Sequence, residues 1–231
     1  TRWIGWENYA RMFADTGFQR ALLNNLYFAA VVVPLQTALA LGLALLVNRS
    51  LKRMVFFRTV FFMPVIYPMV LVSVVWALLL APGQTGIVNQ FLHTISFGTW
   101  NPAMDFLRHP LLAMPAIMLM SIWQGVGYQM VILLAGLQAI PQELYEAAAI
   151  DRAGRWHQFW HVTLPQMRNT ILFVVMVTTI LAFRLFDQVW ILTQGGPQDA
   201  TTTVMFESFV AARERNQVGL GAAMSVVFFA L

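Results

Sequence analysis

Long apolar runs separated by short polar segments are the dominant pattern along the chain. A helix needs about 20 apolar residues to cross the hydrocarbon core of a bilayer. Four complete runs reach this length, at residues 22–47, 57–80, 111–137 and 169–192. A fifth run begins near Val218 and is still apolar at Leu231. Because a segment inside the bilayer must satisfy its own backbone hydrogen bonds, the pattern predicts one all-α domain over residues 1–231, a polytopic bundle of membrane helices.

Composition supports a membrane protein. Hydrophobic residues make up 59% of the chain and charged residues 10%, against roughly 45–50% and 25% in an ordinary soluble domain. The net charge of +4 comes from short segments beside apolar runs, which indicates a lipid bilayer rather than a nucleic acid as the partner. With no cysteine, disulfides and thiolate chemistry are excluded. Because Thr1 lies in a polar stretch and Leu231 in an apolar run, we expect both natural ends to be missing.

The distribution of Lys and Arg predicts the orientation of the chain, because cytoplasmic loops carry an excess of these residues. The densest positive cluster is the segment 48–54, with Arg58 just beyond it. Placing this cluster in the cytoplasm puts residues 81–110 outside, residues 138–168 inside and residues 193–217 outside. The loop 138–168 is therefore predicted to face the cytoplasm.

The loop 138–168 has helical patterning of its own and is much longer than the usual connection of about four to six residues. Pro141 is suited to the start of a helix, and Glu143 lies near the positive end of its dipole. Gly154 is expected to end this helix as a cap. A second amphipathic stretch follows and is expected to end at Leu164-Pro165. The pattern predicts a helix, a turn and a second helix, with small residues that permit close contact with another protein.

The run from Glu146 to Gly154, EAAAIDRAG, followed ten residues on by Leu164-Pro165, is similar to the EAA loop of binding-protein-dependent ABC importer permeases. Arg152 departs from this pattern, which usually has glycine there, and Gly154 is expected to supply the turn instead. A second block, 186–203, contains FDQ, LTQGGP and three consecutive threonines. It resembles the carbohydrate-uptake branch of the family, including its maltose and glycerol-phosphate permeases.

The resemblance implies a multi-pass permease of the type I ABC importer kind in a bacterial inner membrane, with one more helix before Thr1. It implies a second related permease, two ATP-binding subunits and an extracytoplasmic solute-binding protein as partners. ATP and Mg would bind to the ATP-binding subunits, so this chain would be no enzyme and hold no cofactor. The residues carried over as the coupling surface are Glu146, Ala147, Ala148, Asp151, Gly154, Leu164 and Pro165.

Two charged residues in the fourth run are candidates for the solute path. Arg184 and Asp187 are three residues apart, which places them on one face of a helix. Ionisable groups at membrane depth are costly and often mark substrate routes, but a local ion pair explains them equally well. The family resemblance favours the path for Arg184. A guanidinium there would suit a phosphate or another anionic group on the solute, since its planar fork can bind two oxygens.

Three polar residues of the third run form a second candidate, Gln124, Tyr128 and Gln129, beside Trp123. Amide and phenol groups beside an aromatic ring suit the hydroxyls and apolar faces of sugars. Hydrogen bonds between packed helices explain the same residues equally well.

Two other classes of function are weighed against the importer. A secondary transporter driven by an ion gradient would need carboxylates within its spans, and Asp187 is the one such residue. An intramembrane enzyme would need a nucleophile-and-base or metal set. The four histidines do not form a metal site: His157 and His161 share a helical face without a third ligand. The solute predicted from the resemblance is a sugar or a glycerol-phosphate-like compound.

Overall fold

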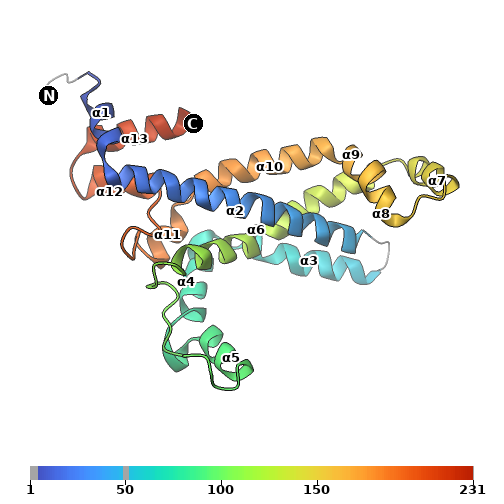
Figure 1. Cartoon of the computed structure of the whole chain (residues 1–231), viewed down its shortest axis with the longest axis horizontal. Coiled ribbons are helices and arrows are strands. Elements are labelled where there is room, and N and C mark those ends of the chain that lie inside the picture. The colour runs from blue at the N-terminus through green and yellow to red at the C-terminus, as the bar shows by residue number, and fades with distance from the viewer. Residues whose placement is uncertain (1–4, 49–51, 231) are drawn as a thin grey trace. The chain divides into compact units, whose positions relative to one another are not determined.

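The computed structural model describes residues 5–48 and 52–230, and within them it contains helices and no strand (Figure 1). The all-α prediction is therefore confirmed. Residues 49–51 of the basic cluster at 48–54 lie outside the described residues, and the orientation stays a prediction. In chain order the helices are α1 Glu7–Ala14, α2 Thr16–Val47, α3 Lys52–Ile66, α4 Met69–Leu79, α5 Ile87–Ile95, α6 Ala113–Gln138, α7 Gln142–Ile150, α8 Arg155–Gln158, α9 Leu164–Gln166, α10 Arg168–Phe183, α11 Asp187–Leu192, α12 Val204–Arg213 and α13 Val218–Ala230.

Within residues 5–48 and 52–230, two helices, α2 and α6, are long and apolar enough to cross a membrane unbroken. Up to four crossings result if two bent pairs each count as one, namely α3 with α4 and the segment 155–166 with α10. The runs predicted at 57–80 and 169–192 are each divided. The first is interrupted at Tyr67 and Pro68, and the second at residues 184–186.

Proline explains the first interruption. Pro68 has no amide hydrogen, and its ring disfavours helical geometry at the preceding Tyr67. The Tyr67 carbonyl, which the break deprives of a helical partner, accepts a hydrogen bond from Nε2 of the buried Gln124 at 3.1 Å. By contrast, Pro34 and Pro64 lie inside unbroken helices. The presence of a proline therefore does not by itself predict where one of these helices ends.

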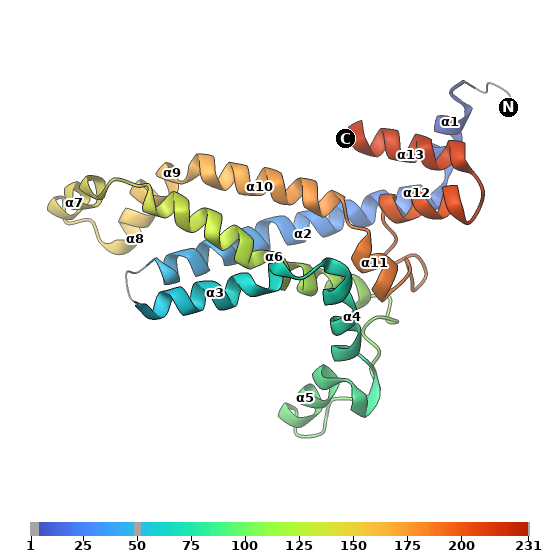
Figure 2. The ribbon, with the colours of Figure 1, turned by 180° about the vertical axis from the view of Figure 1, so that it is seen from behind.

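The chain divides into two compact units. The first comprises residues 1–31, 68–120 and 181–231. In it α1 and α12 pack against α13, and α4 packs against α11 (Figure 2). Its apolar core contains residues from both ends of the described chain: Met12, Phe18, Ala21, Val204, Ala211, Leu220 and Met224.

The second unit comprises residues 32–67 and 121–180, and it carries the loop 138–168. Its apolar core is built from the later parts of α2 and α6, from α10 and from the residue just before α10: Ala40, Ala44, Val47, Met130, Leu133, Leu134, Leu137, Met167 and Val174. At Gly127 a Cβ atom would lie 1.9 Å from the carbonyl oxygen of Phe61. Glycine is therefore required there, and it lets the backbones of α3 and α6 approach closely, as small residues do in membrane bundles.

Candidate functional site

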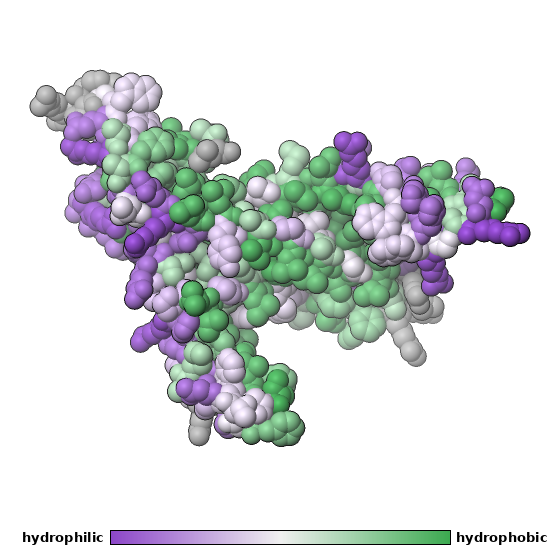
Figure 3. Space-filling view, in the orientation of Figure 1, coloured by the Kyte–Doolittle hydropathy of each residue, from purple (hydrophilic) through white to green (hydrophobic). Residues whose placement is uncertain are grey.

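The loop 138–168 folds as the predicted helix, turn and helix. Helix α7 follows Pro141 directly, and its first turn carries Glu143. Nε2 of Gln142 donates to Oε1 of Glu146 one turn on, at 3.0 Å. None of the nine residues of α7 is buried. Figures 1 and 3 show α7 and α8 beyond the ends of α6 and α10, where polar side chains gather, while apolar side chains cover α10.

The turn after α7 is made by Arg152 and not by Gly154, so that expectation was wrong. Arg152 has a φ of 56° in the left-handed region. The Ala153 amide donates to the Ala148 carbonyl, and the Arg152 amide donates to the Ala149 carbonyl. These two bonds form a Schellman motif, in which the left-handed residue is usually glycine. Gly154 has a φ of −68° and caps the start of α8 instead.

The second half of the loop is one helical segment with a π-helical turn at Phe159–Thr163 between α8 and α9. It continues through Leu164-Pro165 to Gln166 and meets α10 at a bend of 66°. The Tyr145 hydroxyl of α7 and the hydroxyl of the buried Thr163 are hydrogen bonded at 2.9 Å. This bond joins the two halves of the loop.

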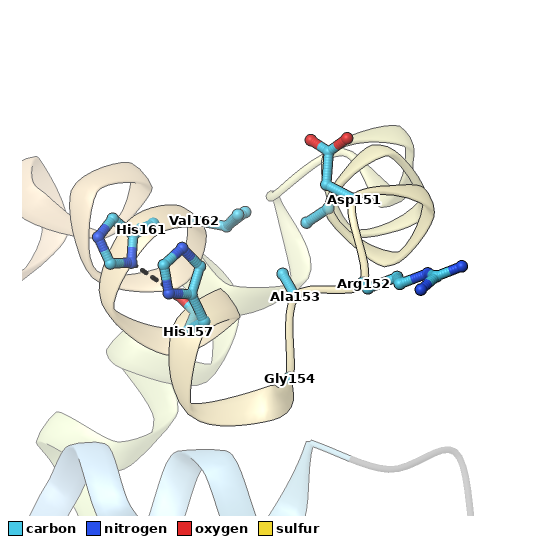
Figure 4. Close-up of a pocket in the computed structure, with 8 residues that line it drawn as sticks. Asp151, Arg152, Ala153, Gly154, His157, His161 and Val162 are labelled. Atoms are coloured by element: carbon cyan, nitrogen blue, oxygen red, sulfur yellow. Dashed lines mark hydrogen bonds between the residues drawn. The ribbon is translucent and has the colours of Figure 1, made fainter.

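A hollow of approximately 450 Å³ lies between the two halves (Figure 4). The rings of His157 and His161 stack on one side of it, with centroids 3.8 Å apart. The Asp151 carboxylate and the Arg152 guanidinium extend away from this pair of rings (Figure 4). The lining residues are Ala148, Asp151, Arg152, Ala153, Gly154, His157, His161 and Val162.

The residues expected to form the coupling surface are mostly accessible. Glu146, Ala147, Asp151, Gly154 and Pro165 are exposed, while Ala148 and Leu164 are half-buried. Ala148, Asp151 and Gly154 meet around the hollow, whereas Leu164 and Pro165 do not line it. Aromatic residues supply much of the apolar face expected of the second, amphipathic stretch. The structure leaves Trp156 73% exposed, stacked on Phe159, so this apolar surface is uncovered in the chain.

The second candidate site lies where α10 ends. Arg184 follows the last residue of α10, and Asp187 is the first residue of α11. Between them Phe186 has φ −137° and ψ −58°, which is not helical. The two residues therefore do not share a face of one helix as expected. Both are exposed, and neither belongs to an ion pair among the described residues.

Two buried polar residues hold this break, and sequence reasoning did not assign them to the site. The amide of the fully buried Asn25 accepts from the Val204 backbone at 2.9 Å and donates to the Phe183 carbonyl at 3.4 Å. The Thr203 hydroxyl donates to the Leu185 carbonyl at 2.8 Å. Thr201 donates to the Gly196 carbonyl at 2.7 Å. The three consecutive threonines, residues 201–203, were the sequence feature that could have indicated these bonds.

The polar cluster of α6 is divided between two surroundings. Gln124 and Gln129 are buried. Gln124 bonds the Tyr67 carbonyl, and Nε2 of Gln129 donates to the Thr178 hydroxyl of α10. Tyr128 is 40% exposed. The two amides thus make the hydrogen bonds between helices that were the alternative to sugar recognition, while the phenol remains accessible.

Comparison with known protein families matches residues 36–231 to the binding-protein-dependent transport system inner membrane component. The chain belongs to this family. The family predicted from the EAA loop is therefore confirmed, and with it a membrane transport component as the general role. Its members are described as inner membrane components, and the relatives that match are transport permeases rather than enzymes.

Individual relatives match along nearly the whole chain. The probable ABC transporter permease protein YurN of Bacillus subtilis is 35% identical, over 97% of this chain and 76% of that protein. The trehalose/maltose transport system permease protein MalF of Thermococcus litoralis is 33% identical, over 99% of this chain and 75% of that protein. The diacetylchitobiose uptake system permease protein NgcF of Streptomyces coelicolor is 32% identical, over 99% of this chain and 67% of that protein.

A solved structure confirms the fold class. The crystal structure of a bacterial ABC transporter involved in the import of the acidic polysaccharide alginate matches with a TM-score of 0.87. The match covers 98% of this chain and 79% of that one, at 24% identity. The chain therefore shares the fold of the matching chain of that transporter.

Proposed function

We propose that this chain is the permease subunit of an ATP-driven importer that takes up a sugar or a glycerol-phosphate-like solute by alternating access. A second permease, two ATP-binding subunits and an extracytoplasmic binding protein complete the transporter. The observation that carries the proposal is helix α7, which has no buried residue and bears the EAA sequence in a chain of this family. An apolar surface that its own chain does not cover fits a docking element for another subunit.

The structure of the loop 138–168 supports its role in coupling. Ile150 of α7 is 83% exposed and Trp156 of α8 is 73% exposed, so each half of the loop has an uncovered apolar side chain. The bond between Tyr145 and Thr163 ties α7 to the segment that continues into α10. A movement of the ATP-binding subunit against α7 would therefore reach a membrane helix through a short, packed connection. On this proposal the loop lies in the cytoplasm.

The coupling role is tested by Glu146→Lys in the reconstituted transporter. Removing one partner of a desolvated charge pair costs about 2–5 kcal/mol, so we expect uptake and solute-stimulated ATP hydrolysis to fall at least about tenfold. The matched control is Glu214→Lys, the same reversal of charge at an exposed residue after α12. Full uptake with the Glu146 variant would contradict the proposed coupling surface.

A carbohydrate solute is supported by the relatives, which are named for trehalose and maltose, diacetylchitobiose and lactose. Within the chain, Arg184 supports a solute with an acidic group. Its guanidinium is exposed and has no ion-pair partner among the described residues. A charge at membrane depth is costly unless it is paired or wetted, and an anionic solute would supply the pair.

Arg184→Gln tests this assignment by comparing acidic and neutral sugars as transported solutes. Hydrogen bonds to charged groups contribute about 1.5–3 kcal/mol, so we expect KM for an acidic sugar to rise roughly 10- to 100-fold. Transport of a neutral sugar should change little. Arg184→Lys is the control that keeps the charge without the planar fork, and its loss should be smaller. Equal effects on acidic and neutral solutes would refute a role for Arg184 in charge recognition.

A further inference from the structure

Helix α5 presents an apolar face that the rest of the chain does not cover. Ile87, Phe91 and Ile95 recur every fourth residue and are 63%, 62% and 54% exposed. At about 100° per residue, these three side chains fall within one quarter of the helix surface. Phe97, just after the helix, is 97% exposed. Such a face marks a contact with a membrane or with another protein.

A buried amide, that of Asn89, fixes α5 to the loop on the side opposite its exposed apolar face. The side chain of Asn89 is fully buried. Its Nδ2 donates to the carbonyls of Ala81 and Met104, both at 2.9 Å, and its Oδ1 accepts from Nε1 of Trp100 at 3.1 Å. One amide therefore joins three parts of the loop behind α5. The loop holds the helix with its apolar face outward.

Length and charge identify what this face contacts. The nine residues of α5 extend about 13 Å, against about 30 Å for the hydrocarbon core, so α5 does not span a membrane. From Thr59 to Met104 the sequence contains no Asp, Glu, Lys or Arg. A protein partner that binds and leaves in each cycle would use a surface with polar and charged rim residues. A contact with lipid acyl chains requires no charged residues around the apolar face.

The face also continues an apolar surface that reaches it from the preceding helix. Helix α4 exposes Val70, Leu71, Val74, Val75 and Leu78, and only residues 80–86 separate α4 from α5. Figure 2 shows α5 lying across the end of α4, and Figure 3 shows apolar surface on one side of the lobe that contains α5. A short helix with one apolar face that follows another apolar helix is suited to the level of the lipid headgroups.

We propose that α5 is an interfacial helix that lies in the surface of the bilayer, with Ile87, Phe91 and Ile95 inserted at the boundary of headgroups and acyl chains. Because the helix has no Lys or Arg, apolar burial alone holds it there. Its contact with lipid is therefore insensitive to salt and to the fraction of anionic lipid. This inference requires only that the chain is a membrane protein, and it does not depend on the solute or on the coupling to ATP.

The 231 residues contain no cysteine, so each single substitution introduces one thiol into them for a nitroxide label, and cysteines of the other subunits are first replaced by serine. Ile87→Cys, Phe91→Cys and Ile95→Cys are labelled one at a time in the assembled transporter in liposomes, with Gln90→Cys as the control on another face of the same helix. The probes are molecular oxygen, which enters lipid, and a water-soluble nickel chelate. We expect the ratio of oxygen to nickel accessibility to be severalfold higher at all three apolar positions than at residue 90, with and without the binding protein.

Two results would overturn the proposal. If the nickel chelate reaches the apolar positions as readily as residue 90, the face is in water. If the labels are shielded from both probes, or become shielded when the binding protein is added, the face belongs to a protein contact. Neither readout involves transport, so a failure of the proposed coupling or solute would leave this test unaffected.

Discussion

Two irregular regions of this molecule differ in whether the chain itself supplies contacts for the groups that each region leaves outside regular helix packing. At the break of residues 184–186, the carbonyls of Phe183 and Leu185 receive hydrogen bonds from side chains distant in sequence, Asn25 and Thr203. Within the loop 138–168, backbone bonds are made locally, but Ile150 and Trp156 remain uncovered. The freed carbonyls of the first region find partners within its own chain. The second leaves an apolar surface exposed, which on the proposed function another subunit covers.

The difference separates residues that hold the fold from residues that serve assembly. A break in a membrane helix is tolerated where the freed backbone groups are bonded inside the protein, so its buried partners contribute to stability. An exposed apolar helix contributes little to the stability of its own chain and much to binding. Substitutions in the two regions should therefore affect different measurements.

The largest effect is expected at the break. Asn25→Leu keeps the branched shape and the number of heavy atoms of the side chain and removes both hydrogen bonds of the amide, leaving the buried Val204 amide and the half-buried Phe183 carbonyl without these partners. Each such group costs about 1–3 kcal/mol, so we expect the free energy of unfolding to fall by roughly 3 kcal/mol, measured by thermal or denaturant unfolding in detergent. Asn24→Leu is the control: Asn24 is less buried and bonds carbonyls nearer the surface, so its loss should be smaller. Equal losses would show that the break does not depend on Asn25.

Ile150→Asp tests the exposed apolar surface of the loop 138–168. An apolar residue at the centre of an interface can contribute 2 kcal/mol or more, so affinity for the ATP-binding subunit should fall by about 30-fold. The thermal unfolding of the isolated permease should not change, because Ile150 is 83% exposed. Ile150→Leu should retain binding. A lower unfolding temperature with intact binding would assign Ile150 to the fold instead.

The smallest effect is expected at the turn after α7. Arg152→Gly removes the cost of a left-handed conformation, about 1–2 kcal/mol, and part of this gain is offset by the greater entropy of the unfolded chain. We expect a net stabilisation of about 0.5–1 kcal/mol, seen as slower hydrogen exchange of the last amides of α7. Arg152→Ala keeps the Cβ atom and should give no gain. If alanine slowed exchange as much as glycine, the arginine side chain rather than the backbone would be the cause.

The sequence predicted features that depend on local pattern. The helical fold, the helix of the EAA loop and its family follow from periodicity and from contiguous residues around Glu146. The break at 184–186 did not follow, because its stability depends on Asn25, which lies far away along the chain. The left-handed turn was assigned to Gly154 because glycine is the usual residue, but the Schellman bonds of α7 place it two residues earlier, at Arg152.

The long stretch without Asp, Glu, Lys or Arg between Thr59 and Met104 has a consequence for the synthesis of the protein. An insertion machinery that reads basic residues meets no such signal while α4 and α5 emerge from the ribosome. The topology of this entire stretch must then be decided by its borders, by Arg58 on one side and by Arg108 on the other. A single added lysine near α5 would introduce a competing signal during biogenesis, even where the finished fold could accommodate it.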